Sequence, residues 1–151
     1  MQIVVVRHAD SVAEGPRLPD EHRYLTARGR ADARALGALL AEAGIAIGAA
    51  VSSPLVRAIQ TAELVTGAIG WAGAIEASCR LAPGTSVSAV ADWLAEEAAR
   101  VQGGALIAFG HEPSISALAE RLSSEEHVSA FRTAEAALVE DGVLRWRLAP
   151  P

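Results

Sequence analysis

The chain of 151 residues contains no lysine and a single cysteine, and only 4% of its residues are aromatic. One cysteine, Cys79, cannot form an internal disulfide, which is typical of proteins from reducing compartments. All 13 basic residues are arginines, and 18 acidic residues bring the net charge to −5. Because nucleic acids and membrane surfaces are usually held by clustered positive charge, this balance argues against both as partners.

Long apolar runs are also missing. No stretch is long enough to span a membrane, and residues 1–6 lack the basic start of a signal peptide, so we expect a cytoplasmic protein. The length suits a single domain over residues 1–151, and an apolar content of 51% suffices for one core covered by helices.

Two apolar segments, residues 3–6 and 104–110, do not alternate with polar residues, which is typical of strands buried on both faces of a parallel sheet. Asp141 and Gly142 separate two alternating segments and predict a hairpin. Apolar spacing predicts helices over residues 27–44, 54–70, 86–103 and 113–122, and further strands over residues 49–53 and 74–81. This order predicts a three-layer α/β/α sandwich with one mostly parallel sheet and a C-terminal β-hairpin.

Two helix starts can be predicted in more detail. Thr26 precedes the first helix and is expected to cap it. Pro54 is expected to be the first residue of the second helix, with Leu55, Ile59 and Ala62 on one side of it.

Polar residues follow three of the predicted strands. Arg7 and His8 follow the first strand, Arg57 comes shortly after the second, and His111 follows the strand at 104–110. Because the carboxyl ends of parallel strands share one edge of the sheet, these four side chains are expected to converge. Two guanidiniums and two imidazoles suit a tetrahedral phosphoryl group. Ser52 and Ser53 are expected to cap the next helix, or one of them to contact the phosphate.

Four segments, "VVVRHAD", "LTARG", "SSPLVRAIQTAE" and "FGHEP", resemble in this order the histidine phosphatase superfamily, over nearly the full chain. The similarity is closest to the small SixA-like branch of protein phosphohistidine phosphatases. It implies a phosphoglycerate mutase-like fold in which His8 is the nucleophile and forms a phosphohistidine. It also implies that Arg7, Arg57 and His111 bind the phosphoryl oxygens, while Ala9 stands where the family usually has glycine.

The residues around His8 favour this role independently. Attack on phosphorus needs a neutral imidazole, and the neighbouring Arg7 and Arg57 should lower the pKa of His8 below its usual value of about 6.5. The arginines would then neutralise charge on the transferring phosphoryl group. This scheme requires no metal and no other cofactor, and His22 and His127 show no ligand spacing with the other histidines.

A proton donor for the leaving group is less evident. In larger relatives an insertion after the second helix carries a carboxylate, but the segment from Thr66 to Ser88 is too short for a lid domain. SixA-like proteins often have an acid before the Leu-x-Pro turn, where this chain has Arg80. The candidate carboxylates are Asp10, Glu76, Glu112 and Asp20, the last of which is also expected to pair with Arg23 in the loop.

We therefore expect a metal-independent phosphatase that removes phosphate from protein phosphohistidine. An imidazole leaving group accepts a proton near neutrality and needs less acid catalysis than an alkoxide. Because the chain has no lid domain, the pocket is expected to be open and to admit a side chain carried by another protein. Two alternatives remain: the same chemistry on a small phosphate ester, and a catalytically idle module that binds phosphate or a partner.

Overall fold

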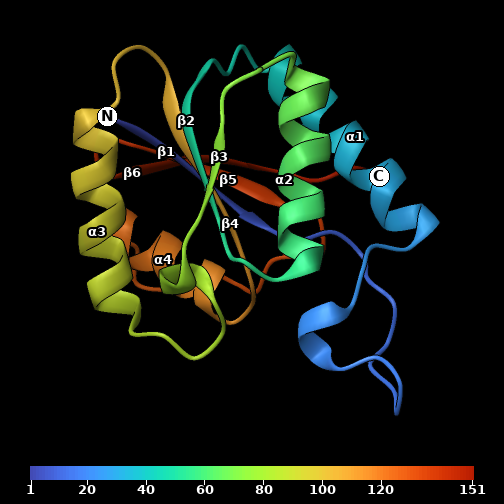
Figure 1. The fold of residues 1–151 in the computed structure, drawn as a ribbon. Helices are drawn as coiled ribbons and strands as arrows, with labels where there is room; N and C mark the ends of the chain where they lie inside the picture. Colours follow the sequence, from blue (N-terminus) through green and yellow to red (C-terminus); the bar gives the residue numbers. More distant parts are fainter.

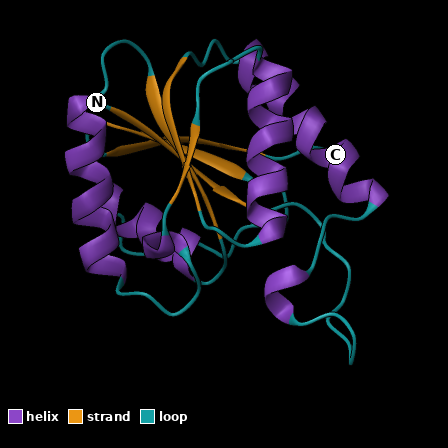
Figure 2. Cartoon of the chain, viewed as in Figure 1, coloured by secondary structure: helices purple, strands orange, loops and turns teal.

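The computed structural model describes residues 1–151, and it contains one six-stranded sheet with helices on both faces (Figures 1 and 2). The strands are β1 (Gln2–Arg7), β2 (Ile47–Ser52), β3 (Ile75–Ala77), β4 (Ala105–Gly110), β5 (Ala136–Glu140) and β6 (Val143–Leu148). The helices are α1 (Ala27–Glu42), α2 (Val56–Ile69), α3 (Val87–Arg100) and α4 (Ser114–Ser123), with short 3-10 helices η1 (Asp20–His22) and η2 (Cys79–Leu81). None of the helices is long and apolar enough to cross a membrane.

The sheet has the order β3-β2-β4-β1-β5-β6. Its first four strands are parallel, β5 runs antiparallel to β1, and β6 returns antiparallel to β5. Asp141 and Gly142 join β5 to β6 with positive φ angles of 48° and 77°, as a tight hairpin turn requires. The mostly parallel sheet and the C-terminal hairpin are thus both confirmed.

Helices α1 and α2 pack on one face of the sheet, and α3 and α4 pack on the other, as Figure 1 shows. Each pair encloses its own half of the core. Leu36 and Phe109 belong to the half under α1 and α2, whereas Leu94 and Ile115 belong to the half under α3 and α4. Strands β1 and β4 lie centrally and are covered on both faces, which explains why their sequences do not alternate.

The start of α2 differs from the prediction. The helix begins at Val56 rather than Pro54, because Leu55 is still extended with a ψ of 140° and its N–H donates to the Ser53 hydroxyl at 3.3 Å. The buried residues of the helix are Arg57, Ala58, Thr61, Ala62, Val65 and Thr66. Of the three residues expected on one side, Ala62 is buried, Ile59 is half-buried, and Leu55 precedes the helix.

The start of α1 agrees with the prediction. The Thr26 hydroxyl accepts the N–H of Gly29 at 2.9 Å, so Thr26 caps the helix. A side chain at Gly29 would place its Cβ 2.0 Å from the carbonyl oxygen of Asp10. The glycine of "LTARG" therefore lets the first turn of α1 lie directly against the segment that follows β1.

The third predicted strand is shorter than expected. Only Ile75–Ala77 pair with β2, and Ser78 then accepts the N–H of Arg80 and begins the short helix η2. This turn and the segment up to Val87 lie at the carboxyl edge of the sheet, at the lower left of Figure 1. The loop after β1 flanks the same edge at the lower right.

Candidate active site

The structure brings Arg7, His8, Arg57 and His111 together at the carboxyl edge of the parallel strands. Arg7 pairs in register with Gly110, and the His8 N–H donates to the Gly110 carbonyl at 3.0 Å, so the ends of β1 and β4 are side by side. The rings of His8 and His111 have centroids 5.3 Å apart. His8, Arg57 and His111 are only 8%, 5% and 4% exposed.

The His8 ring is held in one tautomer. Its Nδ1 lies 2.7 Å from the carbonyl oxygen of Ala9, and because a carbonyl only accepts, Nδ1 carries the proton. Burial, together with the charges of Arg57 and Arg7, lowers the pKa of His8 to about 4, against the opposing effect of the Ala9 hydrogen bond. At neutral pH the ring is therefore uncharged, and its Nε2 has a free electron pair.

Arg7, which is half-buried, and Arg57, which is buried, both use terminal nitrogens within the chain, one in Arg7 and two in Arg57. Arg7 donates from Nη1 to the carbonyl of Phe131 at 2.7 Å, and Arg57 donates from Nη1 to the carbonyl of Asp20 at 2.7 Å. The buried side-chain nitrogens without any partner are Arg7 Nε, Arg57 Nε and His111 Nδ1. All of them belong to the predicted phosphate-binding residues, and a multidentate oxyanion is the kind of ligand that satisfies several such nitrogens at once.

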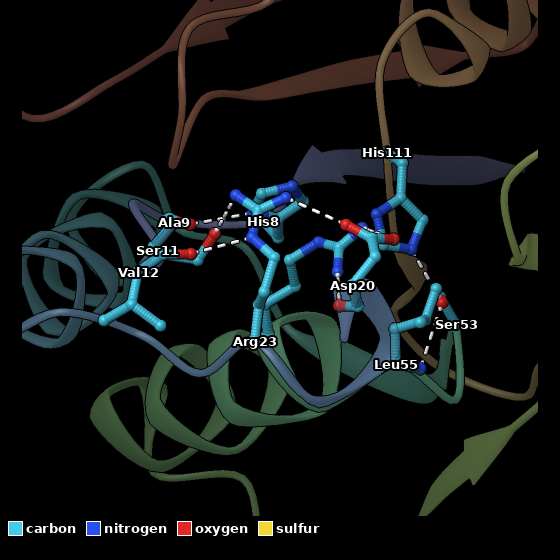
Figure 3. Close-up of polar contacts among 10 residues, drawn as sticks. His8, Ala9, Ser11, Val12, Asp20, Arg23, Ser53, Leu55 and His111 are labelled. Carbon is cyan, nitrogen blue, oxygen red and sulfur yellow. Dashed lines mark hydrogen bonds and ion pairs between the residues drawn. The ribbon is translucent and has the colours of Figure 1, made fainter. Parts of the chain in front are cut away.

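His111 is positioned by Ser53, a residue that the sequence did not single out for this purpose. Its Nε2 lies 2.7 Å from the Ser53 hydroxyl, which also accepts the Leu55 N–H (Figure 3). Burial, followed by the charges of His8 and Arg57, lowers the pKa of His111 to about 3. The Ser53 hydroxyl also holds Leu55, whose backbone is extended, and α2 begins only after it, at Val56.

Thr61 joins two parts of the site and was also missed. Its hydroxyl donates to the Arg57 carbonyl at 2.7 Å and accepts the Ala9 N–H at 3.0 Å, with no exposure to solvent. The residue after His8 is thereby bound to the helix that carries Arg57. The signal available in the sequence was a hydroxyl four residues after Arg57, on the same side of the helix.

The loop between β1 and α1 contributes the carboxylate of Asp20 to the site. The predicted pair forms, with Arg23 Nη1 2.9 Å from one carboxylate oxygen of Asp20, but the other carboxylate oxygen lies 3.2 Å from Arg57 Nη2. Figure 3 shows the Asp20 carboxylate between Arg23 and the ring of His111. The hydrogen bond from Arg23, with a further effect of Arg57, lowers the pKa of Asp20. The ion pair between Asp20 and Arg23 is therefore part of the site. The sequence predicted this pair but gave no sign that it contacts Arg57.

The other carboxylates have structural partners. Asp10 accepts the Thr26 hydroxyl at 2.7 Å, and Glu112 accepts the backbone N–H and the hydroxyl of Ser116, in the first turn of α4, at 2.9 and 2.8 Å. Glu76 is exposed on β3. Of the four candidates, Asp20 is the one that forms an ion pair with a cation of the cluster.

Ser52 is fully buried, and its hydroxyl donates to the Ser53 carbonyl at 2.9 Å. The cap of α2 is Leu55, which has no side-chain hydrogen bond, so Ser52 does not cap the helix. His22 and His127 are both exposed. No group of three or more His, Cys, Asp or Glu side chains is arranged as a metal site.

Buried cations around a neutral histidine, at the carboxyl edge of a parallel sheet, define an enzyme of phosphoryl chemistry. The family model of the histidine phosphatase superfamily (branch 1) matches residues 3–82, which include Arg7, His8 and Arg57, and the chain belongs to this superfamily. The chain is thus a phosphatase. A search of curated proteins finds no match.

Solved structures resemble the whole chain. The protein histidine phosphatase SixA complexed with tungstate is 25% identical, with a TM-score of 0.89 and coverage of 99% of this chain and 97% of that one. A SixA protein from Agrobacterium tumefaciens is 24% identical, with a TM-score of 0.84 and the same coverage of 99% and 97%. A phosphoglycerate mutase from Bacillus anthracis str. Sterne is 20% identical, with a TM-score of 0.72 and coverage of 95% and 90%. The phosphoglycerate mutase-like fold is thereby confirmed.

Proposed function

We propose that this phosphatase hydrolyses phosphohistidine in proteins, with His8 as its nucleophile. The observation that carries the proposal is the position of His8, which is buried beside two arginines with its Nδ1 bonded to the Ala9 carbonyl. Its lowered pKa then leaves the ring uncharged at neutral pH. A neutral imidazole with a free Nε2 electron pair is the form that attacks phosphorus. The tungstate bound by a similar SixA is a tetrahedral oxyanion, as is phosphate, and supports this assignment.

In the first step, His8 Nε2 forms a bond to phosphorus while the bond from phosphorus to the substrate's imidazole nitrogen breaks. The leaving imidazole nitrogen takes up a proton from water. Arg7, Arg57 and His111 bind the equatorial oxygens, where charge must be stabilised. The nitrogens of these residues that have no partner within the chain supply the donors.

In the second step, water attacks the phosphorus, the bond to His8 breaks, and inorganic phosphate leaves. The attacking water must lose a proton. Asp20 contacts Arg57, and its carboxylate is ionised at neutral pH, as that of an ordinary aspartate is. An ionised carboxylate is suited to accept this proton and unsuited to protonate a leaving group.

A site with a proton acceptor but no proton donor favours an imidazole leaving group over an alkoxide. An alkoxide needs a positioned general acid, which contributes about 100-fold to 10,000-fold in rate, whereas imidazole has a conjugate acid with a pKa of about 6.5. The similarity to SixA proteins points to the same substrate class. We also propose a cytoplasmic location and a phosphorylated protein as the partner.

The test compares kcat/KM for a phosphohistidine-bearing protein with kcat/KM for a panel of sugar and nucleoside phosphates. We expect the phosphohistidine protein to be preferred by at least about 100-fold, which corresponds to the missing general acid. Asp20→Asn should slow release of phosphate from phosphorylated His8 in single-turnover measurements. Asp10→Asn, Glu76→Gln and Glu112→Gln are the matched controls.

A clear preference for a small ester, removed by one of these carboxylate substitutions, would identify the alternative substrate class and its acid. The absence of turnover with every substrate, together with tight binding of phosphate, would favour an idle binding module instead.

A further inference from the structure

Arg80 is an exposed arginine at the carboxyl edge of the sheet whose guanidinium has no hydrogen bond or ion pair within the chain. Its guanidinium carbon lies 5.1 Å from the centre of the Trp93 ring in α3. Stacking on an aromatic face restricts the side chain and leaves the N–H groups at the rim of the guanidinium free. Arg80 therefore presents several donors in a restricted orientation.

The backbone of Arg80 is also held in place. Its N–H donates to the Ser78 hydroxyl at 3.3 Å, and its carbonyl accepts the Thr85 hydroxyl at 2.7 Å. These contacts close the turn from η2 to the start of α3. The two hydrogen bonds thus hold the backbone of Arg80, and the Trp93 ring restricts its guanidinium.

Arg80 opens onto a hollow that reaches the catalytic cluster. The hollow is small, with a volume of about 10 Å³, and Arg80 and Thr85 line it together with Gly110 and His111. Its other lining residues are Leu81, Val87, Val90, Ser114, Ile115 and Leu118. Arg80 and His111 therefore border the same hollow at the carboxyl edge of the sheet.

The arginines on the opposite side of the cluster differ from Arg80 in their partners. Asp20 forms ion pairs with both Arg23 and Arg57. No carboxylate forms an ion pair with Arg80, although acidic residues outnumber basic ones in the chain, 18 to 13. Arg80 is thus a cation that has a restricted orientation and no ion-pair partner in an acidic protein. Such a cation is suited to bind an anion from outside the chain.

We propose that Arg80 binds a carboxylate that the substrate carries next to its phosphoryl group, and so selects among substrates. This inference rests on the proposed function of the same site, since the phosphoryl group anchors the substrate at His8. The carboxylate belongs either to an acidic side chain flanking a phosphohistidine or to a small phosphate ester. Arg80 makes no contact with the reacting atoms in this proposal and is a specificity residue.

The decisive experiment uses two phosphohistidine peptides of one sequence, with glutamate or glutamine beside the phosphohistidine. We expect wild-type protein to have a kcat/KM about three- to tenfold higher for the glutamate peptide, mainly through KM, as an exposed charged pair allows. Arg80→Gln should remove this preference, and Arg80→Glu should reverse it. The preference should also weaken at high salt. Arg34→Gln, which removes an exposed arginine on α1, is the matched control and should leave the preference intact.

Hydrolysis of both peptides at equal efficiency, or a preference that survives Arg80→Gln, would overturn this inference and leave the proposed function standing. A second pair of substrates, 3-phosphoglycerate and glycerol 3-phosphate, identifies the source of the carboxylate. Turnover of these esters but of neither peptide would overturn the proposed function. A carboxylate preference among the esters that Arg80→Gln removes would then still support the role of Arg80.

Discussion

Arg57 belongs to the cluster at the strand ends and Arg23 to the loop after β1, and both form ion pairs with Asp20. The two arginines differ in whether all their guanidinium nitrogens have hydrogen-bond partners within the chain. Arg23 uses all its guanidinium nitrogens within the chain, on the Val12 carbonyl, the Ser11 hydroxyl and the Asp20 carboxylate. Arg57 is buried, yet its Nε has no partner.

A buried donor without a partner costs about 1–3 kcal/mol in stability. The cluster of Arg7, His8, Arg57 and His111, here called the strand-end cluster, therefore makes the protein less stable than apolar residues in the same places would. The loop after β1, in contrast, is satisfied by its own contacts. The comparison indicates that the strand-end cluster is built for a ligand and that the loop holds Asp20 and Arg57 in position. The predictions below test this division.

The largest effect is expected at the strand ends. His8→Ala should lower kcat/KM by at least about 10,000-fold, because it removes the nucleophile, while inorganic phosphate still binds to the remaining donors. Hydrolysis assays and calorimetric titration with phosphate measure the two properties separately. Activity near that of wild type would show that the mechanism is not covalent catalysis by His8.

Arg57→Ala and Arg23→Ala compare the two regions directly. We expect Arg57→Ala to lower kcat/KM by about 100-fold to 1,000-fold, because a buried donor to the transferring group is lost. Arg23→Ala should cost about tenfold, since Arg23 acts mainly through Asp20. The measurement is steady-state kinetics on one phosphohistidine substrate. A larger loss for Arg23→Ala would reverse the proposed roles of the two regions.

The pH dependence follows from the lowered pKa values. The pKa of His8 is about 4, so its neutral form persists well below the usual value of about 6.5, and kcat/KM should not decline with the titration of an ordinary histidine. The lowered pKa values also affect stability. His8 and His111 are buried in the folded protein and have pKa values of about 4 and about 3, so they bind protons less readily there than in the unfolded chain. Below pH 6.5 the unfolded chain thus binds more protons, and the free energy of unfolding should fall as the pH falls from about 6.5 to about 4.

Urea unfolding of wild type and His8→Ala at several pH values tests this second part. The variant should lose less stability than wild type between pH 6.5 and pH 4. Equal losses in the two proteins would mean that His8 is not held in its uncharged form by the fold.

A smaller effect is expected for the contact between Ala9 and α2. Thr61→Val removes a buried hydroxyl that bonds to two backbone groups, so it should lower the free energy of unfolding by about 1–3 kcal/mol and reduce kcat several-fold. Thr66→Val is a matched control in the same helix, because the Thr66 hydroxyl bonds to carbonyls of its own helix, chiefly Ala62 at 2.8 Å. Equal kinetic effects of both substitutions would contradict a positioning role for Thr61.

The smallest effect is expected from chelation. Because no step of the proposed mechanism uses a metal, activity should be unchanged in excess EDTA. Loss of activity on chelation, restored by a divalent cation, would contradict the proposed mechanism.

Much of the fold could be predicted from local patterns. The β-branched run of residues 3–6 indicates a buried strand, Thr26 caps its helix, and Asp141 with Gly142 forms the hairpin turn, since these depend on neighbouring residues alone. The convergence of Arg7, His8 and His111 was also accessible, because parallel strands end at one edge of the sheet.

Other features of the site depend on contacts between residues that are distant in the sequence. The burial of Arg57 depends on where α2 begins, after the extended Leu55, and the Ser53 hydroxyl that holds Leu55 also contacts His111. The place of Asp20 depends on an arginine 37 positions away. No periodicity within a helix or loop encodes such contacts, because they exist only once the strands have paired and α2 has packed on the sheet. The sequence by itself therefore determined which groups are present at the edge and the class of chemistry, and tertiary packing decided which of them touch.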